Sequence, residues 1–76
     1  MNIIDNSECL TGFGQFIRNR RVDRGLSQKE VAEVLDITDM YYSLIERGQR
    51  NVDLVMAMRI CDVLGLKLTD FIAKYM

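Results

Sequence analysis

The fold is decided by residues 27–47, which have the sequence SQKEVAEVLDITDMYYSLIER. The first four residues form a capping box, in which the Ser27 hydroxyl accepts a hydrogen bond from a first-turn N–H and Glu30 accepts one from the N–H of Ser27. The apolar residues that follow recur at helical spacing: Val31, Ala32, Val34 and Leu35. We therefore expect a helix that starts at this box and ends at Asp36.

A second helix is expected directly afterwards, from Asp39 to about Arg47, with Thr38 as its N-cap. At about 100° per residue, Tyr42 and Ile45 fall on the side of this helix that faces the core. The small side chain of Ala32 would allow the two helices to approach each other closely. About three residues join the helices, which is the span of a helix-turn-helix. Taken alone, the pattern also fits a plain helical hairpin.

Three further helices are expected around this pair. One runs from about Phe13 to Arg24 and follows residues 1–11, which we interpret as a loosely ordered arm. Another starts after Asp53 and ends at Gly65, and the last runs from about Thr69 to Met76. The core face of the helix before Gly65 is predicted to comprise Leu54, Ala57, Met58, Cys61 and Leu64. The predicted fold is all-α, with five helices in one domain over residues 1–76.

Composition limits what such a chain can do. It has 76 residues, of which 49% are hydrophobic, and this is enough for one core. No long apolar run or secretory signal is present, so we expect a cytoplasmic protein without membrane contact. With two cysteines and no histidine, no metal, cofactor or catalytic set is expected, and we predict a protein that is not an enzyme. The net charge of -1 means that any affinity for DNA must come from local patches.

Several motifs stand together in a recognisable order. They are Gly25-Leu26-Ser27-Gln28, Val31-Ala32, the stretch from Tyr42 to Asn51, and Leu64-Gly65-Leu66. Over residues 13–72 the chain resembles the Cro/repressor (Xre-like) helix-turn-helix family, whose small phage repressors and restriction-modification controller proteins are closest to it in size. The resemblance implies a compact, lambda-repressor-like DNA-binding domain.

Two positions depart from the family pattern. Asp36 replaces the glycine usual in the turn, and aspartate tolerates the left-handed conformation at a modest cost. Lys67 replaces the serine or threonine that commonly caps the last helix. We therefore expect the turn to be kept, while the start of the last helix is less well defined by the sequence.

The resemblance implies a set of contacts to DNA phosphates. Gln28 stands at the N-terminus of its helix, where backbone N–H groups attract anions. Arg50 and Asn51 match the turn that contacts the DNA backbone in the family, with Arg47 and Arg18 as helpers. The alternatives are that Gln28 is an ordinary first-turn residue and that the arginines form a solvated charged turn.

The family also pairs an arginine of the first helix with the glutamate of the Ile-Glu-Arg-Gly turn. In this chain the corresponding residues are Arg21 and Glu46. The resemblance therefore implies a partly buried ion pair that holds the first helix to the recognition helix.

Base reading is implied for the first turns of the third helix, at Thr38, Asp39, Met40, Tyr41, Ser43 and Leu44. Family members often carry Gln, Arg, Lys or Asn at these places, whereas Met40 and Leu44 can pack only on apolar groups such as thymine methyls. Asp39 would either accept from a cytosine amino group or simply complement the helix dipole. The alternative for Met40 and Leu44 is contact with another protein.

The end of the chain is rich in large apolar side chains that so small a domain cannot cover completely. We expect them to form an isologous dimer interface comprising Leu68, Phe71, Ile72, Tyr75 and Met76. The alternative is that Phe71 and Ile72 close the core of the monomer. A dimer would place two recognition helices roughly 34 Å apart, on successive major grooves of a palindromic site.

These observations favour a sequence-specific DNA-binding transcriptional regulator that acts as a homodimer on a palindromic operator, as a restriction-modification controller or phage-type repressor. Its partners would be double-stranded DNA and a second copy of itself, with no small-molecule ligand. The alternative, supported by the acidic Asp39 and the negative net charge, is an antitoxin-like or anti-repressor module that binds protein through the same scaffold.

Overall fold

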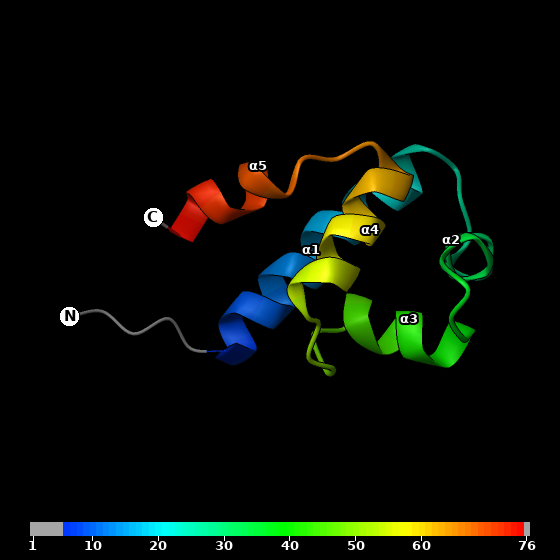
Figure 1. Cartoon of the computed structure of the whole chain (residues 1–76), viewed down its shortest axis with the longest axis horizontal. Coiled ribbons are helices and arrows are strands. Elements are labelled where there is room, and N and C mark those ends of the chain that lie inside the picture. The colour runs from blue at the N-terminus through cyan, green and yellow to red at the C-terminus, as the bar shows by residue number, and fades with distance from the viewer. Residues whose placement is uncertain (1–5, 76) are drawn as a thin grey trace.

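The computed structural model describes residues 6–75, and the side chains of 7–74. Within this range all regular secondary structure is helical and no strand is present, as the sequence predicted (Figure 1). The elements are α1 (Asn6–Asp23), α2 (Gln28–Leu35), α3 (Asp39–Glu46), α4 (Leu54–Leu64) and α5 (Leu68–Ile72), followed by a short 3-10 helix (Ala73–Tyr75).

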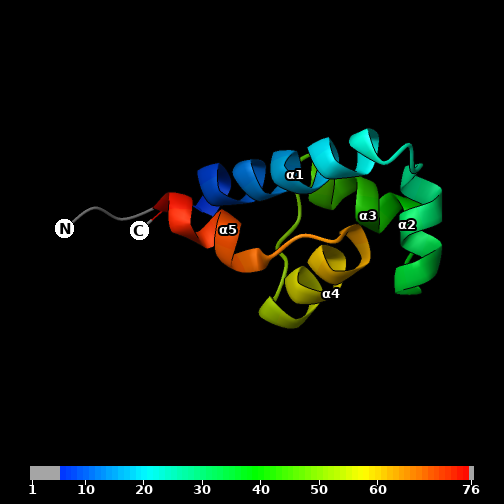
Figure 2. The same ribbon diagram turned by 90° about the horizontal axis from the view of Figure 1, so that it is seen from above.

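The longest helix, α1, packs against α3 and α4. Helix α2 packs against the same two helices. Seen from above, α5 lies alongside the first half of α1 (Figure 2). The ring of Phe71 in α5 meets those of Phe13 and Phe16 in α1, with centroids 5.3 and 5.5 Å apart. Helix α5 is thereby joined to the core.

The core is formed mainly by side chains from α1 to α4. Tyr42 and Ile45 face inward, as expected, and are 0% and 1% exposed. Ala32 is fully buried between the helices. The buried set comprises Phe13, Ile17, Val31, Ala32, Leu35, Tyr42, Ile45, Ala57, Ile60, Cys61, Leu64 and Phe71.

The predicted core face of α4 was partly wrong. Leu54 and Met58 were expected inside but are 64% and 55% exposed, and Ile60 takes their place in the core. Apolar residues surround most of α4, so their spacing did not determine its rotation. Packing against α1 and α2 on one side decides which of these residues are buried.

The start of α1 was also predicted wrongly, at about Phe13. Helix α1 begins at Asn6, so residues 6–11, which were expected in a loose arm, are helical. This turn of helix is held by contacts: Cys9 is half-buried against the core, and Gly48 lies so close to Thr11 that a Cβ there would be 2.7 Å from the Thr11 Cα. Residues 1–5 lie outside the described range.

Candidate DNA-binding surface

The turn between α2 and α3 has the geometry that its sequence predicts. Ser27 Oγ accepts from the N–H of Glu30 at 3.0 Å, and Glu30 Oε1 accepts from the N–H of Ser27 at 2.9 Å. Asp36 adopts the left-handed conformation, with φ 59°, in place of the family's glycine. Thr38 Oγ1 then caps α3 by accepting from the N–H of Tyr41 at 3.1 Å. Each of the two helices is thus capped at its start by a side-chain hydrogen bond.

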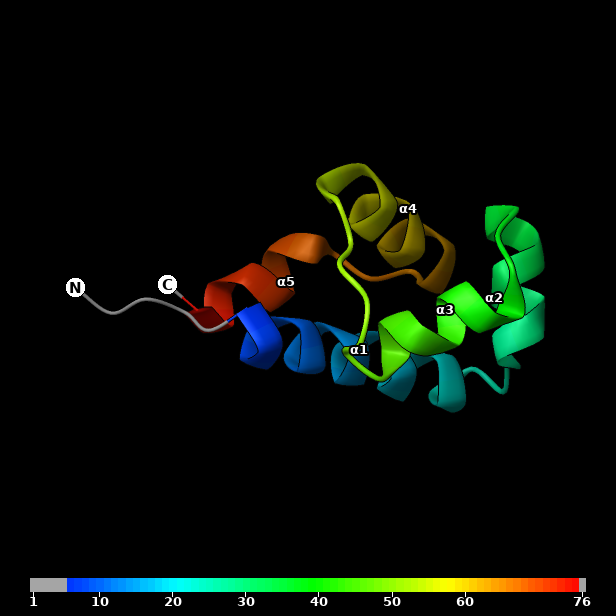
Figure 3. The same cartoon turned by 90° about the horizontal axis from the view of Figure 1, so that it is seen from below.

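Helix α3 lies at one surface of the molecule. From below, no other helix of the described chain is drawn over it (Figure 3). Met40 is 69% exposed, and Thr38 and Asp39 are exposed beside it, whereas Ser43, Leu44 and Tyr41 are partly buried. The first turn of α3 is therefore the part most open to a partner.

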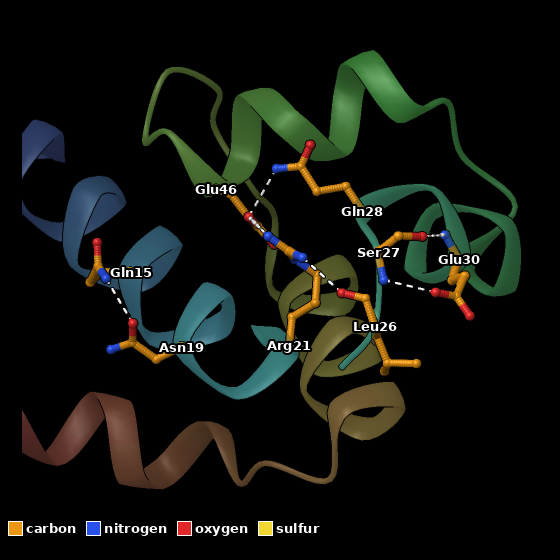
Figure 4. A network of polar contacts seen from close by, with 8 residues as sticks. All are labelled: Gln15, Asn19, Arg21, Leu26, Ser27, Gln28, Glu30 and Glu46. Atoms are coloured by element: carbon orange, nitrogen blue, oxygen red, sulfur yellow. Dashed lines mark hydrogen bonds and ion pairs between the residues drawn. The ribbon is translucent and has the colours of Figure 1, made fainter. Parts of the chain in front are cut away.

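The Arg21 and Glu46 side chains form a two-bond ion pair between α1 and the end of α3 (Figure 4). Arg21 Nε lies 2.6 Å from Glu46 Oε2, and Arg21 Nη2 lies 3.0 Å from Oε1. The side chains are only 11% and 2% exposed. Arg21 Nη1 also donates to the Leu26 carbonyl oxygen at 2.8 Å, which joins the pair to the segment before α2.

Gln28 is part of the same network, which the sequence did not predict. Its Nε2 donates to Glu46 Oε1 at 3.0 Å, so α2 is tied to the end of α3 (Figure 4). Burial alone would raise the pKa of Glu46, but the hydrogen bonds from Arg21 and Gln28 outweigh it and lower the pKa below its usual value. Glu46 is therefore a buried carboxylate that connects three helices.

The Tyr42 hydroxyl lies beside this network. It is buried and, among the described side chains, makes no hydrogen bond of good geometry. Burial and the neighbouring Glu46 carboxylate both raise its pKa, so it stays a neutral phenol. The network thus carries its charge on Arg21 and Glu46 alone.

The segment after α3 folds back onto that helix. Gly48, with φ 72°, allows the turn, and the N–H of Gln49 donates to the Leu44 carbonyl at 2.9 Å. Arg47, Arg50 and Asn51 are exposed in this segment, and Arg18 is exposed on α1. The Arg50 guanidinium lies over the ring of Tyr41, 5.1 Å from its centroid. A predicted phosphate-binding residue, Arg50, is therefore in contact with a predicted base-reading residue, Tyr41.

Two other exposed arginines, Arg20 of α1 and Arg24 directly after this helix, point elsewhere. Arg20 Nη1 lies 3.4 Å from the carbonyl oxygen of Gly65, at the end of α4. Arg24 is also placed near Gly65. These two cations thus provide charge-matched controls for the arginines near α3.

The predicted dimer residues do not share one environment. Phe71 is 6% exposed and belongs to the monomer core, so its assignment to an interface was wrong. Leu68 is half-buried, Ile72 is 40% exposed, and the Tyr75 side chain and Met76 lie outside the described part. Helix α4 carries three exposed apolar side chains, Leu54, Val55 and Met58, and the last two border a groove of about 660 Å³ between α4 and α5. It is lined by Val55, Met58, Arg59, Cys61, Asp62, Leu66, Leu68, Thr69 and Ile72.

A sequence model of one protein family, described as helix-turn-helix, matches residues 17–71, which includes α2, α3 and α4. The chain belongs to the helix-turn-helix family. Its resemblance to the Cro/repressor (Xre-like) group is therefore confirmed, and the protein is a DNA-binding transcriptional regulator of this type.

Curated relatives include control proteins of similar length. C.MunI of Mycoplasma sp is 39% identical over 59 residues, which are 76% of this chain and 80% of the relative. C.BamHI of Bacillus amyloliquefaciens is 38% identical over 61 residues, covering 79% and 75%. An uncharacterised helix-turn-helix regulator of Bacillus subtilis, YqaF, is 32% identical over 57 residues, covering 75% of each chain.

Solved structures agree with this assignment. The restriction-modification controller protein C.AhdI of Aeromonas hydrophila superposes with a TM-score of 0.79 at 34% identity, over 90% of this chain and 99% of that one. The clp gene regulator ClgR of Corynebacterium glutamicum gives a TM-score of 0.80 at 28% identity, over 86% and 69%. The five-helix fold predicted from the sequence is thus the fold of known helix-turn-helix regulators.

Two residues that support the helix-turn-helix were missed by sequence reasoning. Gly14 lies in the middle of α1, where a Cβ would overlap the Glu46 carbonyl oxygen. Arg59 of α4 donates through Nη2 to the Leu35 carbonyl oxygen at 2.8 Å, which satisfies an end group of α2. A glycine inside a helix costs stability, so its presence was a signal of close packing. The contact of Arg59 gave no such signal, because it joins distant parts of the sequence.

The described residues contain neither a membrane-spanning helix nor a metal site. No helix in the described part combines the length and apolar character needed to span a bilayer. Among the same residues, no group of three or more His, Cys, Asp or Glu side chains is placed to hold a metal ion.

Proposed function

We propose that the protein is a sequence-specific regulator that binds a palindromic operator as a homodimer, as a restriction-modification controller or phage-type repressor. The observation that carries this proposal is the open first turn of α3, with Met40 69% exposed and arginines beside it. The control proteins among its relatives support the hypothesis that it is a restriction-modification controller. Occupancy of a promoter would be its mechanism, since blocking or recruiting polymerase requires no further domain.

In this proposal α3 enters the major groove of DNA with its N-terminal end leading. Met40, and the exposed part of Leu44, would pack on thymine methyl groups, while Thr38, Asp39 and Ser43 offer polar contacts to base edges. Gln28, Arg18, Arg47, Arg50 and Asn51 would contact phosphates. The hydrogen bond from Gln28 to Glu46 uses one of its two amide N–H bonds and leaves the second for a phosphate.

The dimer would form through the α4–α5 surface, defined here as Leu54, Val55, Met58 and Ile72. All four are between 40% and 66% exposed. A single recognition helix contacts too few base pairs to select one site in a genome, whereas two copies double the recognised length. Arg59 and Asp62 both border the same groove. In a two-fold interface, each such residue can pair with the opposite charge of the other copy.

The second candidate function is an antitoxin-like or anti-repressor module that binds protein through α3. Asp39 and the exposed Met40 favour it, because an acidic residue beside an apolar one is a poor match to a phosphate-rich surface. Under this alternative the same face would contact a protein partner.

The deciding experiment is selection from a random pool of duplex DNA, followed by fluorescence anisotropy with the selected duplex and a scrambled one. We expect thymine-containing selected sites, and a wild-type preference for the selected duplex that Met40→Ala reduces. Val34→Ala is the matched control, because Val34 on α2 is 68% exposed, nearly as much as Met40. Failure to enrich any sequence at moderate salt would refute the regulator proposal and leave the protein-binding module.

A further inference from the structure

The contact between Arg50 and Tyr41 joins two residues that the sequence assigned to different tasks. Tyr41 lies in the first turns of α3 and is half-buried against the core, so the position of its ring is restricted. Arg50 is exposed in the segment that folds back after Gly48. Its guanidinium carbon lies 5.1 Å from the ring centroid. Within the described residues, Arg50 makes this ring contact but no ion pair or hydrogen bond to another side chain.

A ring contact of this kind leaves the donors of the guanidinium available. The attraction acts between the cation and the face of the aromatic ring, within about 6 Å. The five N–H donors lie in the guanidinium plane and still point outward to acceptors such as phosphate oxygens. A free arginine side chain must lose conformational freedom on binding, and one already held on a ring loses less.

We propose that Tyr41 is a positioning residue for Arg50, and that the two together form one phosphate-binding unit beside α3. This proposal rests on the proposed function, because it takes DNA as the ligand. It changes the role of Tyr41 from reading bases to holding the cation that contacts the backbone. The ring, rather than the hydroxyl, is the part of Tyr41 that carries this role.

The two roles differ in measurable ways. A base-reading tyrosine affects the preference for one sequence over another, and its effect does not depend on Arg50. A positioning tyrosine affects binding to all DNA about equally, and only while Arg50 is present. Phenylalanine keeps the ring face and so replaces a positioning tyrosine, whereas leucine does not.

The test is a double-mutant cycle on DNA affinity, with Tyr41→Leu, Arg50→Gln and the double variant. Affinity is measured by anisotropy on the selected duplex and on a scrambled duplex of the same composition. Contacts of this type at exposed sites correspond to a change of about two- to fivefold in affinity. We expect Tyr41→Leu to weaken binding to both duplexes by this factor in the wild-type background, and to have almost no effect in the Arg50→Gln background. Tyr41→Phe is expected to bind like the wild type, and Arg20→Gln is the charge control for Arg50→Gln.

Several results would overturn the inference. Equal losses from Tyr41→Leu with and without Arg50 would show that the residues act independently. A Tyr41→Phe variant as weak as Tyr41→Leu would assign the role to the hydroxyl, and a changed sequence preference would restore base reading. A wild-type protein that binds neither duplex would overturn the proposed function itself, whereas wild-type binding with additive losses overturns only this inference.

Because Tyr41 is half-buried, Tyr41→Leu has to be checked for folding by its unfolding midpoint. A second measurement does not depend on that variant. In NMR spectra of the free protein, the ring current of Tyr41 should displace the Arg50 side-chain proton resonances upfield, in the wild type and in Tyr41→Phe alike. Unshifted Arg50 resonances in the wild type would overturn the proposal.

Discussion

Replacing Glu46 with alanine removes the acceptor that connects three helices. Glu46 accepts from Arg21 Nε, Arg21 Nη2 and Gln28 Nε2 at 2.6, 3.0 and 3.0 Å. Without it, the Leu26 carbonyl is the one hydrogen-bond partner left to the Arg21 guanidinium among the described residues. Breaking a buried ion pair in this way costs about 3–5 kcal/mol. The whole chain of 76 residues is expected to have a stability of about 4–11 kcal/mol, so this loss is a large part of it.

The measurement is urea unfolding followed by circular dichroism, together with a thermal melt. For a domain of this size, a loss of at least about 3 kcal/mol lowers the melting temperature by about 12 °C or more. Glu33→Ala is the matched control, since Glu33 is exposed on α2 and its loss should change stability by no more than about 0.5 kcal/mol. Replacing Arg21 and Glu46 together with methionine should recover much of the loss, because no charge is then left unpaired. A Glu46→Ala variant as stable as Glu33→Ala would refute the reasoning.

The same network predicts a dependence on pH. The folded pKa of Glu46 is lowered, so the unfolded chain binds more protons in the range between the folded value and the unfolded value of about 4.3. The stability contributed by Glu46 is therefore complete above the unfolded pKa and is lost as the pH falls through the folded pKa. Unfolding curves of the wild type and Glu46→Gln should converge toward acid pH, and a constant difference between them would contradict this.

Three other predictions follow from packing. Gly14→Ala should destabilise the protein by more than about 1 kcal/mol, although alanine favours helices, because its Cβ overlaps the Glu46 carbonyl. The Cβ of Gly25→Ala meets no atom within 4 Å, so this variant should lose only about 1 kcal/mol for its left-handed backbone. Urea unfolding compares the two variants, and an equal or larger loss in Gly25→Ala would contradict the packing argument. Met58→Lys should convert a dimer to a monomer in sedimentation, whereas Val34→Lys should not, and a wild-type monomer well above micromolar concentration would remove the dimer. Burial raises the pKa of the Cys61 thiol to about 11. In a Cys9→Ser variant this thiol should therefore react with a disulfide reagent at pH 8 only as fast as the protein opens. Immediate reaction would show that the thiol lies at the surface.

Local signals predicted the helix boundaries near the turn correctly. The capping box at Ser27, the cap at Thr38 and the left-handed Asp36 each depend on residues within four positions, and all were read from the sequence. The inward positions of Tyr42 and Ile45 followed from their spacing on one side of α3, although Met40 and Leu44 on the opposite side are also apolar.

Tertiary contacts explain what the sequence could not provide. The rotation of α4 was not determined, since apolar residues occur nearly all around it, and so Met58 was placed inside. The first turns of α1 lie against Gly48, which is far along the chain, and spacing within residues 6–11 could not indicate this contact. Likewise, Phe71 was assigned to a dimer because its partner Phe13 could not be identified from spacing. The contact between Arg50 and Tyr41 depends on how the segment after α3 folds back.

The central claim is that α3 and its adjacent segment are the surface that meets DNA. The most direct measurement is an NMR titration of the labelled protein with the selected duplex. We predict that the largest shifts fall on Thr38 to Leu44, Gln28 and the Arg50 side chain, with small shifts over the exposed face of α4. Shifts concentrated on α4 and α5, with α3 unchanged at saturating DNA, would contradict it.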